Sequence, residues 1–206
     1  MSEAILFPRS VVQEVLCELL HSFDPHPALG RPHALVDRIC AVGGYRRQKR
    51  EMKDIELLYI GRRRVQADPQ DMLGAEVEMD LAEQLVTDLR RRGILAPRLD
   101  KNDRESWGEW NKHAVHVASG LPIDLFAATA ENYFNRLVVT TGPADLNKRI
   151  AAAARVKGWE WEVYQPGFVP LGGTWDSCPR ERRTMRSERE VFEFVGLEYL
   201  PPEARK

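Results

Sequence analysis

The sequence predicts an α+β protein: a first part with a mixed sheet and flanking helices, then a smaller, mainly helical second part with some strand. Three observations support this class. Apolar residues recur at helical spacing over residues 9–23 and 81–89. The composition changes after about residue 140, which divides the two parts. Short apolar runs typical of buried strands lie over residues 38–42, 54–60, 94–99 and 114–126.

Local signals place the helices of the second part. Pro143 suits the first turn of a helix that is expected to run to about Lys157. Ser187 and Glu190 form an S-x-x-E capping box, which predicts the start of another helix. Gly196 is expected to end that helix. Residues 24–33 hold three prolines and a glycine and predict a loop.

Charge is unevenly distributed along the chain. The 206 residues carry a formal net charge of -1, whereas a dedicated nucleic-acid binder usually has a basic surplus. Between Gly43 and Arg64, however, eight Lys or Arg residues face three Asp or Glu residues. Such a stretch either meets phosphates or forms a solvated charged face, and composition alone does not decide between them.

Targeting signals are not evident. The first eight residues lack a basic region followed by a long apolar run, so we expect no secretory signal. No run approaches the roughly 18 apolar residues that span a membrane. With three dispersed cysteines and no CxxC pair, we expect a reducing, cytoplasmic compartment and no zinc site or disulfide framework.

Acidic residues within predicted strands are the strongest chemical signal. Asp54 and Glu56 are two residues apart, so they point to the same face of a strand. Asp124 is a third acid within an apolar strand. Carboxylates on one apolar face repel each other and are costly to bury, and a hard divalent cation between them removes that cost. Three such acids predict a site for two Mg²⁺ or Mn²⁺ ions.

A glycine pair followed by arginines precedes these acids. Gly43 and Gly44 follow a predicted strand and allow backbone N–H groups to approach phosphate oxygens. Arg46 and Arg47 add forked hydrogen-bond donors. Each motif alone is more often structural, but their order along the chain is far more specific. By contrast, histidines 113 and 116 lie three apart, face opposite sides of a strand and are expected to have structural or surface roles.

Several segments together resemble the family X DNA polymerases, the polymerase beta-like group. The resemblance runs over nearly the whole chain and is weakest over residues 61–120. It is carried by the segments GGYRRQKREMKDIELLYI, LPIDLF, TTGPADLN, KGWEWEVY and SEREVFEFVGLEYLPPEAR. The resemblance implies a nucleotidyltransferase palm over residues 1–140 and a small α/β thumb over residues 141–206.

The resemblance also implies roles for individual residues. Asp54, Glu56 and Asp124 would be the catalytic metal ligands, with Asp124 nearest the primer 3′ hydroxyl. The partners implied are a nucleoside triphosphate and a gapped or primed DNA duplex. The residues expected to bind the nucleotide are Arg9, Gly43, Gly44, Arg47, Gly142 and Asn147. The residues expected to contact nucleic acid are Arg62, Arg63, Arg64, Arg182 and Arg183.

The chain departs from the family pattern at several positions. Glu56 stands where the family has Asp, which shifts metal geometry and suggests a preference for Mn²⁺. Gly44 replaces a serine, with loss of a hydroxyl contact to phosphate. Val139 and Thr140 replace an aromatic pair beside the sugar. The family's lyase domain and helix-hairpin-helix segments are not expected, so DNA contact would rest on basic surface clusters or on an accessory DNA-binding protein.

Three functions remain open at this point. The first is a minimal DNA polymerase that adds nucleotides to a DNA 3′ hydroxyl with release of pyrophosphate, in gap filling or repair. The second is a nucleotidyltransferase with another acceptor, such as RNA, a protein or a small molecule. The third is a non-catalytic binding module, which the retention of all three acids and Arg47 argues against.

Overall fold

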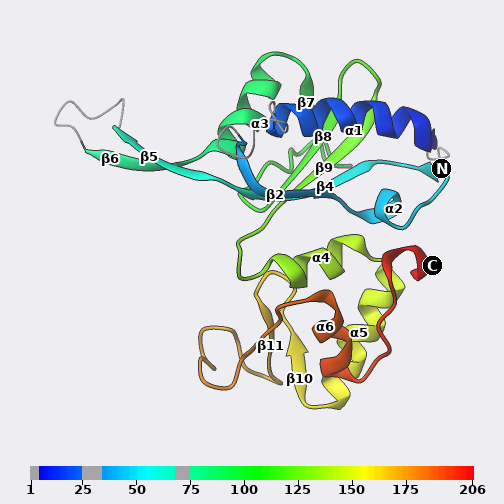
Figure 1. The fold of residues 1–206 in the computed structure, drawn as a ribbon, viewed down its shortest axis with the longest axis vertical. Helices are drawn as coiled ribbons and strands as arrows, with labels where there is room; N and C mark the ends of the chain where they lie inside the picture. Colours follow the sequence, from blue (N-terminus) through cyan, green and yellow to red (C-terminus); the bar gives the residue numbers. More distant parts are fainter. Residues whose placement is uncertain (1–4, 25–33, 68–74) are drawn as a thin grey trace. The chain divides into compact units, whose positions relative to one another are not determined.

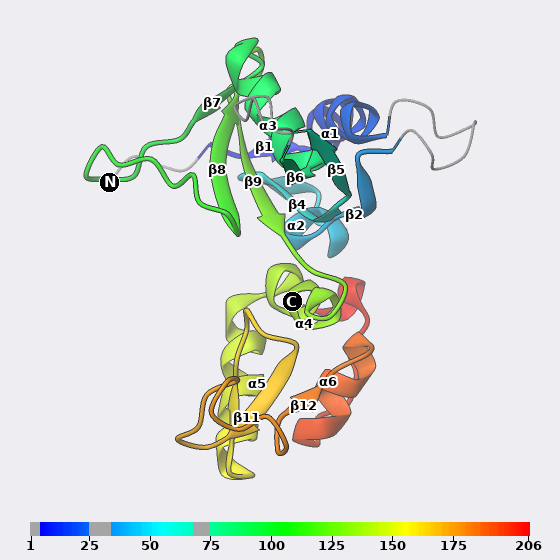
Figure 2. The same ribbon diagram turned by 90° about the vertical axis from the view of Figure 1, so that its left-hand side faces the viewer.

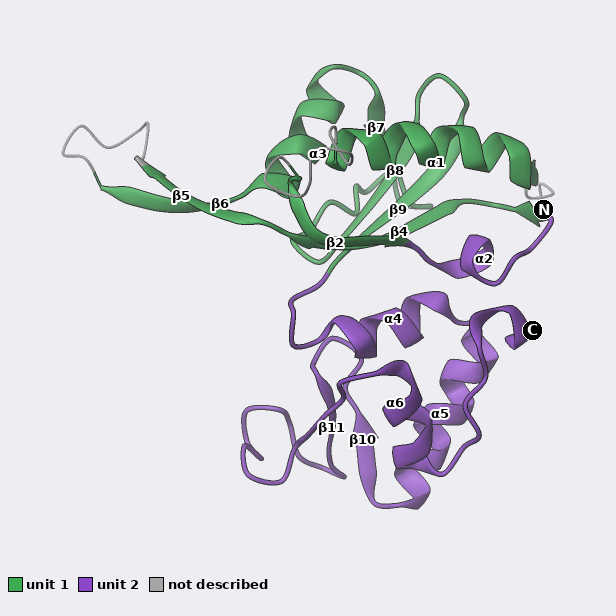
Figure 3. Cartoon of the chain, in the orientation of Figure 1, with its two compact units in different colours: residues 1–40, 51–127 green, residues 41–50, 128–206 purple. Residues whose placement is uncertain are grey.

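The computed structural model describes residues 5–24, 34–67 and 75–206. Residues 25–33 of the expected loop lie outside the described residues. The fold is α+β with a mixed sheet, as predicted. The chain forms two compact units, coloured separately in Figure 3. The first unit comprises residues 1–40 and 51–127, and the second comprises residues 41–50 and 128–206. The predicted division into palm and thumb at residue 140 stays a prediction.

A five-stranded mixed sheet forms the centre of the first unit (Figure 1). Its strand order is β2-β4-β9-β8-β7. Strands β4 and β9 run parallel, whereas β9 pairs antiparallel with β8 and β8 with β7. The strands are β2 (Val36–Ala41), β4 (Ile55–Gly61), β7 (Leu95–Pro97), β8 (Asn111–His116) and β9 (Leu121–Ala127).

Two helices, α1 (Arg9–Phe23) and α3 (Leu81–Arg91), lie on the same side of this sheet (Figure 1). Helix α1 has the predicted bounds, because its apolar residues repeat at helical spacing and bury one face. Helix α3 is capped by Asp80, whose carboxylate accepts hydrogen bonds from the backbone N–H of Ala82 and Glu83 at 2.9 and 3.1 Å. The two helices cover the apolar face of the sheet.

Alternation along β4 and β8 identifies which side chains face the helices. Tyr59 stacks at a tilt on Phe23 of α1, with ring centroids 5.6 Å apart. The fully buried Lys112 of β8 reaches Glu83 of α3, with Nζ 2.6 Å from Oε2. The neighbours Glu56 and His113 are an odd number of residues from these positions, so they face the opposite side of the sheet.

A two-stranded ribbon extends away from the sheet in the first unit (Figure 1). It pairs β5 (Arg63–Ala67) with β6 (Glu76–Asp80) antiparallel. This ribbon was not predicted, although Val77 and Met79 alternate with acidic residues along β6. A second short pair joins β1 (Phe7–Pro8) to β3 (Glu51–Met52).

The second unit gathers four helices with a three-stranded antiparallel sheet (Figure 2). Its buried core is built from Val138, Leu146, Ile150, Ala154, Trp161, Phe168, Met185, Val191, Phe192 and Val195. Its elements are α2 (Gly43–Arg46), α4 (Tyr133–Thr141), α5 (Ala144–Val156), β10 (Trp159–Trp161), β11 (Gly167–Pro170), β12 (Arg183–Thr184), α6 (Glu188–Val195) and the short 3-10 helix η3 (Pro202–Ala204).

The capping signals of the second unit are confirmed in detail. Ser187 Oγ accepts from the backbone N–H of Glu190 at 3.1 Å at the start of α6. The Glu190 carboxylate accepts from the backbone N–H of Arg186, at 2.6 Å, one residue before the position that a regular capping box uses. Gly196 ends the helix in the left-handed region with φ of 77°.

One predicted strand was wrong in extent. The run over residues 114–126 forms two strands, β8 and β9, joined by a tight turn. Gly120 adopts a φ of 70° in that turn and donates its N–H to His116 O at 2.8 Å. Ser119 Oγ lies 2.8 Å from Nδ1 of His116. The apolar residues on both sides of the turn made the segment look continuous.

Among the described residues, no helix is both long enough and apolar enough to cross a membrane.

Candidate functional site

The three predicted acids share one face of the sheet in the first unit. Glu56 of β4 and Asp124 of β9 are direct partners in the parallel register. Asp54 immediately precedes β4 and is two residues from Glu56, so alternation assigns it to the same face. Asp124 is 8% exposed, and the other two acids are half-buried. The fold therefore places the three carboxylates on one face of the sheet, two of them on neighbouring strands and Asp54 just before β4.

Two further side chains extend this arrangement across the sheet. His113 of β8 is the register partner of Asp124 on its other side. Arg98 follows β7 and donates its backbone N–H to His113 O at 2.9 Å, which continues the ladder by one residue. We call Glu56, Asp124, His113 and Arg98 the cross-sheet row.

Asp124 is held by the two basic members of the cross-sheet row. Arg98 Nη2 donates to Asp124 Oδ1 at 2.7 Å. His113 Nδ1 lies 2.8 Å from the same oxygen and 3.0 Å from Arg98 Nη2. A carboxylate with so little exposure needs such partners, because an unpaired buried charge costs several kcal/mol.

Sequence reasoning missed both basic members of the cross-sheet row. His113 and His116 do face opposite sides of the strand, but His113 contacts a predicted catalytic acid and His116 does not. Arg98 lies next to a short strand with no motif around it. Only the register of β7, β8 and β9 brings these side chains to Asp124, and single-strand spacing carries no such information.

The acid set suits a hard divalent cation chemically, since all of its donors are carboxylate oxygens. In the positions observed, however, these side chains do not converge. Within the described part of the chain, no group of three or more His, Cys, Asp or Glu side chains is arranged to hold a metal ion. Asp124 is turned to Arg98 and His113 instead.

Five of the six predicted nucleotide-binding residues lie in the second unit, around the C-terminal end of α4. Gly43 and Gly44 are the buried first residues of α2. Arg47 ends that helix and donates through Nη1 to the carbonyl oxygen of Thr141. Gly142 ends α4 with φ of 63°, and a Cβ atom there would lie 3.2 Å from Arg47 Nη1.

Asn147 completes this group from helix α5. Its Nδ2 donates to the carbonyl oxygen of Val139 at 2.8 Å. Its Oδ1 is buried and has no hydrogen-bond partner among the described residues. Arg9, the sixth predicted nucleotide-binding residue, begins α1 in the first unit.

A buried charge network fixes α2 within the second unit. Arg46 Nη1 and Nη2 donate to Glu188 Oε1 and Oε2 at 2.8 and 2.6 Å, and Nη1 also donates to Thr141 Oγ1 at 2.7 Å. Arg205 Nη2 lies 3.0 Å from Glu188 Oε1. We call Arg46, Thr141, Glu188 and Arg205 the Glu188 network. It attaches the Gly43-Gly44 segment to the end of α4 and the start of α6.

Arg205 is buried at 2% exposure. Its guanidinium lies over the rings of Phe192 and Tyr199, at 5.2 and 5.8 Å from their centroids. Its Nε donates to the carbonyl oxygen of Leu200 at 2.9 Å. The penultimate residue of the chain is therefore packed into the second unit rather than solvated.

The Glu188 network makes stability sensitive to acid. Burial disfavours the charged carboxylate, but the hydrogen bonds and charges of Arg46 and Arg205 outweigh burial and lower the pKa of Glu188. A lowered folded pKa adds stability above the unfolded pKa of about 4.3, and that stability is lost as pH falls through the folded value. We expect the difference in unfolding free energy between wild type and Glu188→Gln to be constant above about pH 5 and to shrink below it. Urea unfolding between about pH 3 and 7 measures this difference, and a difference that grows on acidification would contradict the assignment.

The five arginines predicted to contact nucleic acid differ in the side chains that they contact. Arg62 pairs with Asp37 at 3.2 Å and Arg63 with Glu78 at 2.9 Å, whereas Arg64 is an exposed residue of β5. In the second unit, the guanidinium of Arg182 lies 4.9 Å from the ring centroid of Trp175. That of Arg183 lies 5.3 Å from the ring centroid of Trp159.

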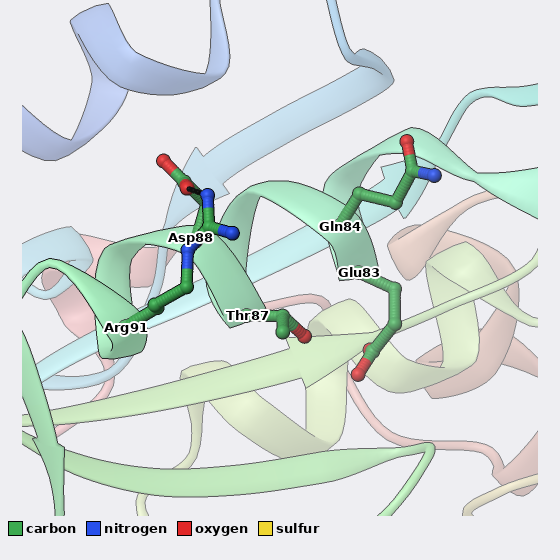
Figure 4. A pocket seen from close by; sticks show the side chains of 5 residues that line it. All are labelled: Glu83, Gln84, Thr87, Asp88 and Arg91. Carbon is green, nitrogen blue, oxygen red and sulfur yellow. Dashed lines mark hydrogen bonds and ion pairs between the residues drawn. The ribbon is translucent and has the colours of Figure 1, made fainter.

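A surface hollow runs along α3, lined by Glu83, Gln84, Thr87, Asp88 and Arg91 (Figure 4). All five come from one helix, which covers the apolar face of the sheet. The cross-sheet row lies on the opposite face, so the hollow is no part of it.

The fold and the cross-sheet row define an α+β protein whose mixed sheet carries carboxylates on the face opposite its helices. Residues 136–206 match the family described as DNA polymerase beta thumb. This match lies within the second unit. A search of curated proteins found no match.

Proposed function

We propose that this chain is a divalent-metal-dependent nucleotidyltransferase, a minimal family X-like DNA polymerase acting in gap filling or repair. The match of residues 136–206 to the polymerase beta thumb carries the proposal. The shared face of Asp54, Glu56 and Asp124 in the first unit agrees with it. The reaction joins the primer 3′ oxygen to the α-phosphorus of a nucleoside triphosphate and releases pyrophosphate.

The three acids have distinct tasks in this proposal. Asp54, Glu56 and Asp124 would hold two Mg²⁺ or Mn²⁺ ions, which supply charge neutralisation at the attacking hydroxyl and the leaving pyrophosphate. Asp124, the most buried of the three, would take the proton that leaves the 3′ hydroxyl. Glu56 reaches one methylene further than aspartate, which is why we expect Mn²⁺ to support the reaction well.

The nucleotide would be bound by groups from the second unit. Gly43 and Gly44, the first residues of α2, would bring backbone N–H groups close to phosphate oxygens, and Arg47 would supply positive charge beside them. The buried Oδ1 of Asn147 offers an acceptor to a donor group on the sugar or base. Arg9 of the first unit would contact the triphosphate.

DNA binding would rest on basic side chains outside these sites. Arg182 and Arg183 are held over tryptophan rings, so their guanidinium groups lose little freedom when they contact phosphate. The group of Arg62, Arg63 and Arg64 is the second candidate contact. Because the formal net charge of the chain is -1, an accessory DNA-binding protein would strengthen the interaction.

Primer extension on a duplex with a one-nucleotide gap tests the proposal. We expect templated addition of one deoxynucleotide with Mg²⁺, at least equal addition with Mn²⁺, and none with EDTA. Asp124→Ala prepared in parallel excludes a contaminating polymerase. Absence of extension under all metal conditions would contradict the proposal that the chain is a polymerase by itself, whatever its affinity for the nucleotide.

The lack of an overall basic surplus favours a second candidate, transfer to an acceptor other than DNA. The same reaction mixtures, supplied with radiolabelled triphosphate and with RNA or protein in place of DNA, distinguish the two candidates. Metal-dependent labelling of such an acceptor, without extension of DNA, would replace the polymerase proposal by this one.

A further inference from the structure

Arg98 is the constant donor in the cluster around Asp124. A guanidinium stays charged at any physiological pH and has no acceptor, so Arg98 is always the donor in its contact with Asp124 Oδ1. His113 Nδ1 contacts both Arg98 and Asp124. It accepts from Arg98 when it carries no proton and donates to Asp124 when it does, but it does not do both at once.

This arrangement gives Asp124 a cation from within the protein. The Arg98 and Asp124 side chains are 32% and 12% exposed, so their ion pair is only partly screened by solvent. Glu56 lies beside Asp124 in the register and adds negative charge from the neighbouring strand. The positive guanidinium thus lowers the cost of placing these carboxylates on one face.

A divalent ion bound by the same carboxylates would lie close to the Arg98 guanidinium. Both compete for the Asp124 carboxylate, and both are positive, so they repel each other. The observed side chains agree with this competition. Both Arg98 and His113 contact Oδ1 of Asp124, at 2.7 and 2.8 Å.

We infer that Arg98 is an internal counter-ion of Asp124 that competes with the divalent metal, and that metal binding exchanges the Arg98–Asp124 contact for a metal–Asp124 bond. His113 is a positioning residue that keeps Arg98 and Asp124 together in the metal-free protein. The inference rests on the proposed function, because it takes Asp124 as a metal ligand.

The experiment measures the dissociation constant of Mn²⁺ for the full chain, from the electron paramagnetic resonance signal of free Mn²⁺. Arg98→Gln is expected to bind Mn²⁺ about tenfold more tightly than wild type, because the variant lacks a positive charge that would repel the divalent ion. Arg98→Lys keeps the charge and is expected to restore weaker binding. A purely structural role for Arg98 would not tighten metal binding.

Arg91→Gln is the matched control. Arg91 Nη2 is also 2.7 Å from an aspartate oxygen, Asp88 Oδ1, but its side chain is 81% exposed and lies on α3. We expect its Mn²⁺ affinity to equal that of wild type. Asp124→Asn is expected to lose most Mn²⁺ binding, which assigns the signal to this site.

The Mn²⁺ binding results can overturn this inference without overturning the proposed function. Unchanged or weaker Mn²⁺ binding by Arg98→Gln, with wild type binding normally, overturns the competition and leaves the proposed function standing. Absence of Mn²⁺ binding in both proteins overturns both. Should Arg98→Gln not fold, a Mg²⁺ titration of wild type followed through the Arg98 and His113 side-chain NMR signals decides the question. Both signals are expected to shift on metal binding, and unchanged signals would overturn the inference.

Discussion

Under the proposed function, replacement of Asp124 by alanine is expected to lower the rate of nucleotide incorporation at least about a thousandfold, since a carboxylate that holds a catalytic metal contributes several kcal/mol of transition-state stabilisation. Asp124 lies between Glu56 and His113 in the cross-sheet row and is the least exposed of the three predicted acids. Asp124→Asn keeps the shape of the side chain and removes its charge. A comparable loss in this variant would assign the effect to charge.

Single-turnover incorporation on gapped duplex gives these rates. Asp88→Ala is the matched control, because the Asp88 carboxylate also accepts from an arginine Nη2 at 2.7 Å but lies on α3. We expect its incorporation rate to stay within about twofold of wild type, since exposed ion pairs contribute little. Circular dichroism confirms that each variant is folded. A folded Asp124→Ala protein with more than a tenth of the wild-type rate would exclude the catalytic role of this residue.

Replacement of Glu188 by alanine is expected to lower the free energy of unfolding by about 3–5 kcal/mol, the usual cost of removing one partner from a buried ion pair. The Glu188 carboxylate is the counter-charge of two arginines. Arg46 donates to both of its oxygens, and Arg205, almost fully buried, lies 3.0 Å from one of them. Without Glu188, both positive charges would remain in the second unit without their counter-charge.

Urea unfolding of Glu188→Ala measures this loss, with Glu193→Ala as the control on the same helix. Glu193 is 59% exposed and lies 3.9 Å from Arg189, so its removal is expected to change the free energy of unfolding by less than about 0.5 kcal/mol. Equal losses in the two variants, or a loss below about 1 kcal/mol for Glu188→Ala, would show that the Glu188 network contributes no more than a surface pair.

Much of the fold followed from local sequence signals. The bounds of α1 were predicted because fifteen residues repeat their apolar positions with helical period. The start and end of α6 were predicted because Ser187 and Gly196 have specific backbone roles. These signals act within a few residues, so a single sequence displays them.

Helix α4 was not predicted, for a physical reason. Its sequence, YFNRLVVTT, is rich in β-branched and aromatic residues with low intrinsic helix propensity. Packing against the rest of the second unit supplies the stability that propensity lacks. Val138 is fully buried in the core, and Asn135 Oδ1 accepts from Trp161 Nε1 at 2.5 Å. Contacts of this kind between distant residues leave no local mark in the sequence.

The same distinction between local signals and contacts of distant residues applies to the candidate site. Residues that share a strand, such as Asp54 and Glu56, were paired by spacing alone. Arg98 and His113 reach Asp124 across two strand pairings, and a shift of one residue in either register would turn them to the other face. The roles of Arg46 and Glu188, which are 142 residues apart, were equally inaccessible.

The division of the chain into units has a consequence for engineering. The polypeptide passes between the units three times, after residues 40, 50 and 127. A fragment that begins at residue 128 would contain Glu188 and Arg205 but would lack Arg46. Transplanting the C-terminal segment onto another protein would therefore require residues 41–50 as a second, separate graft.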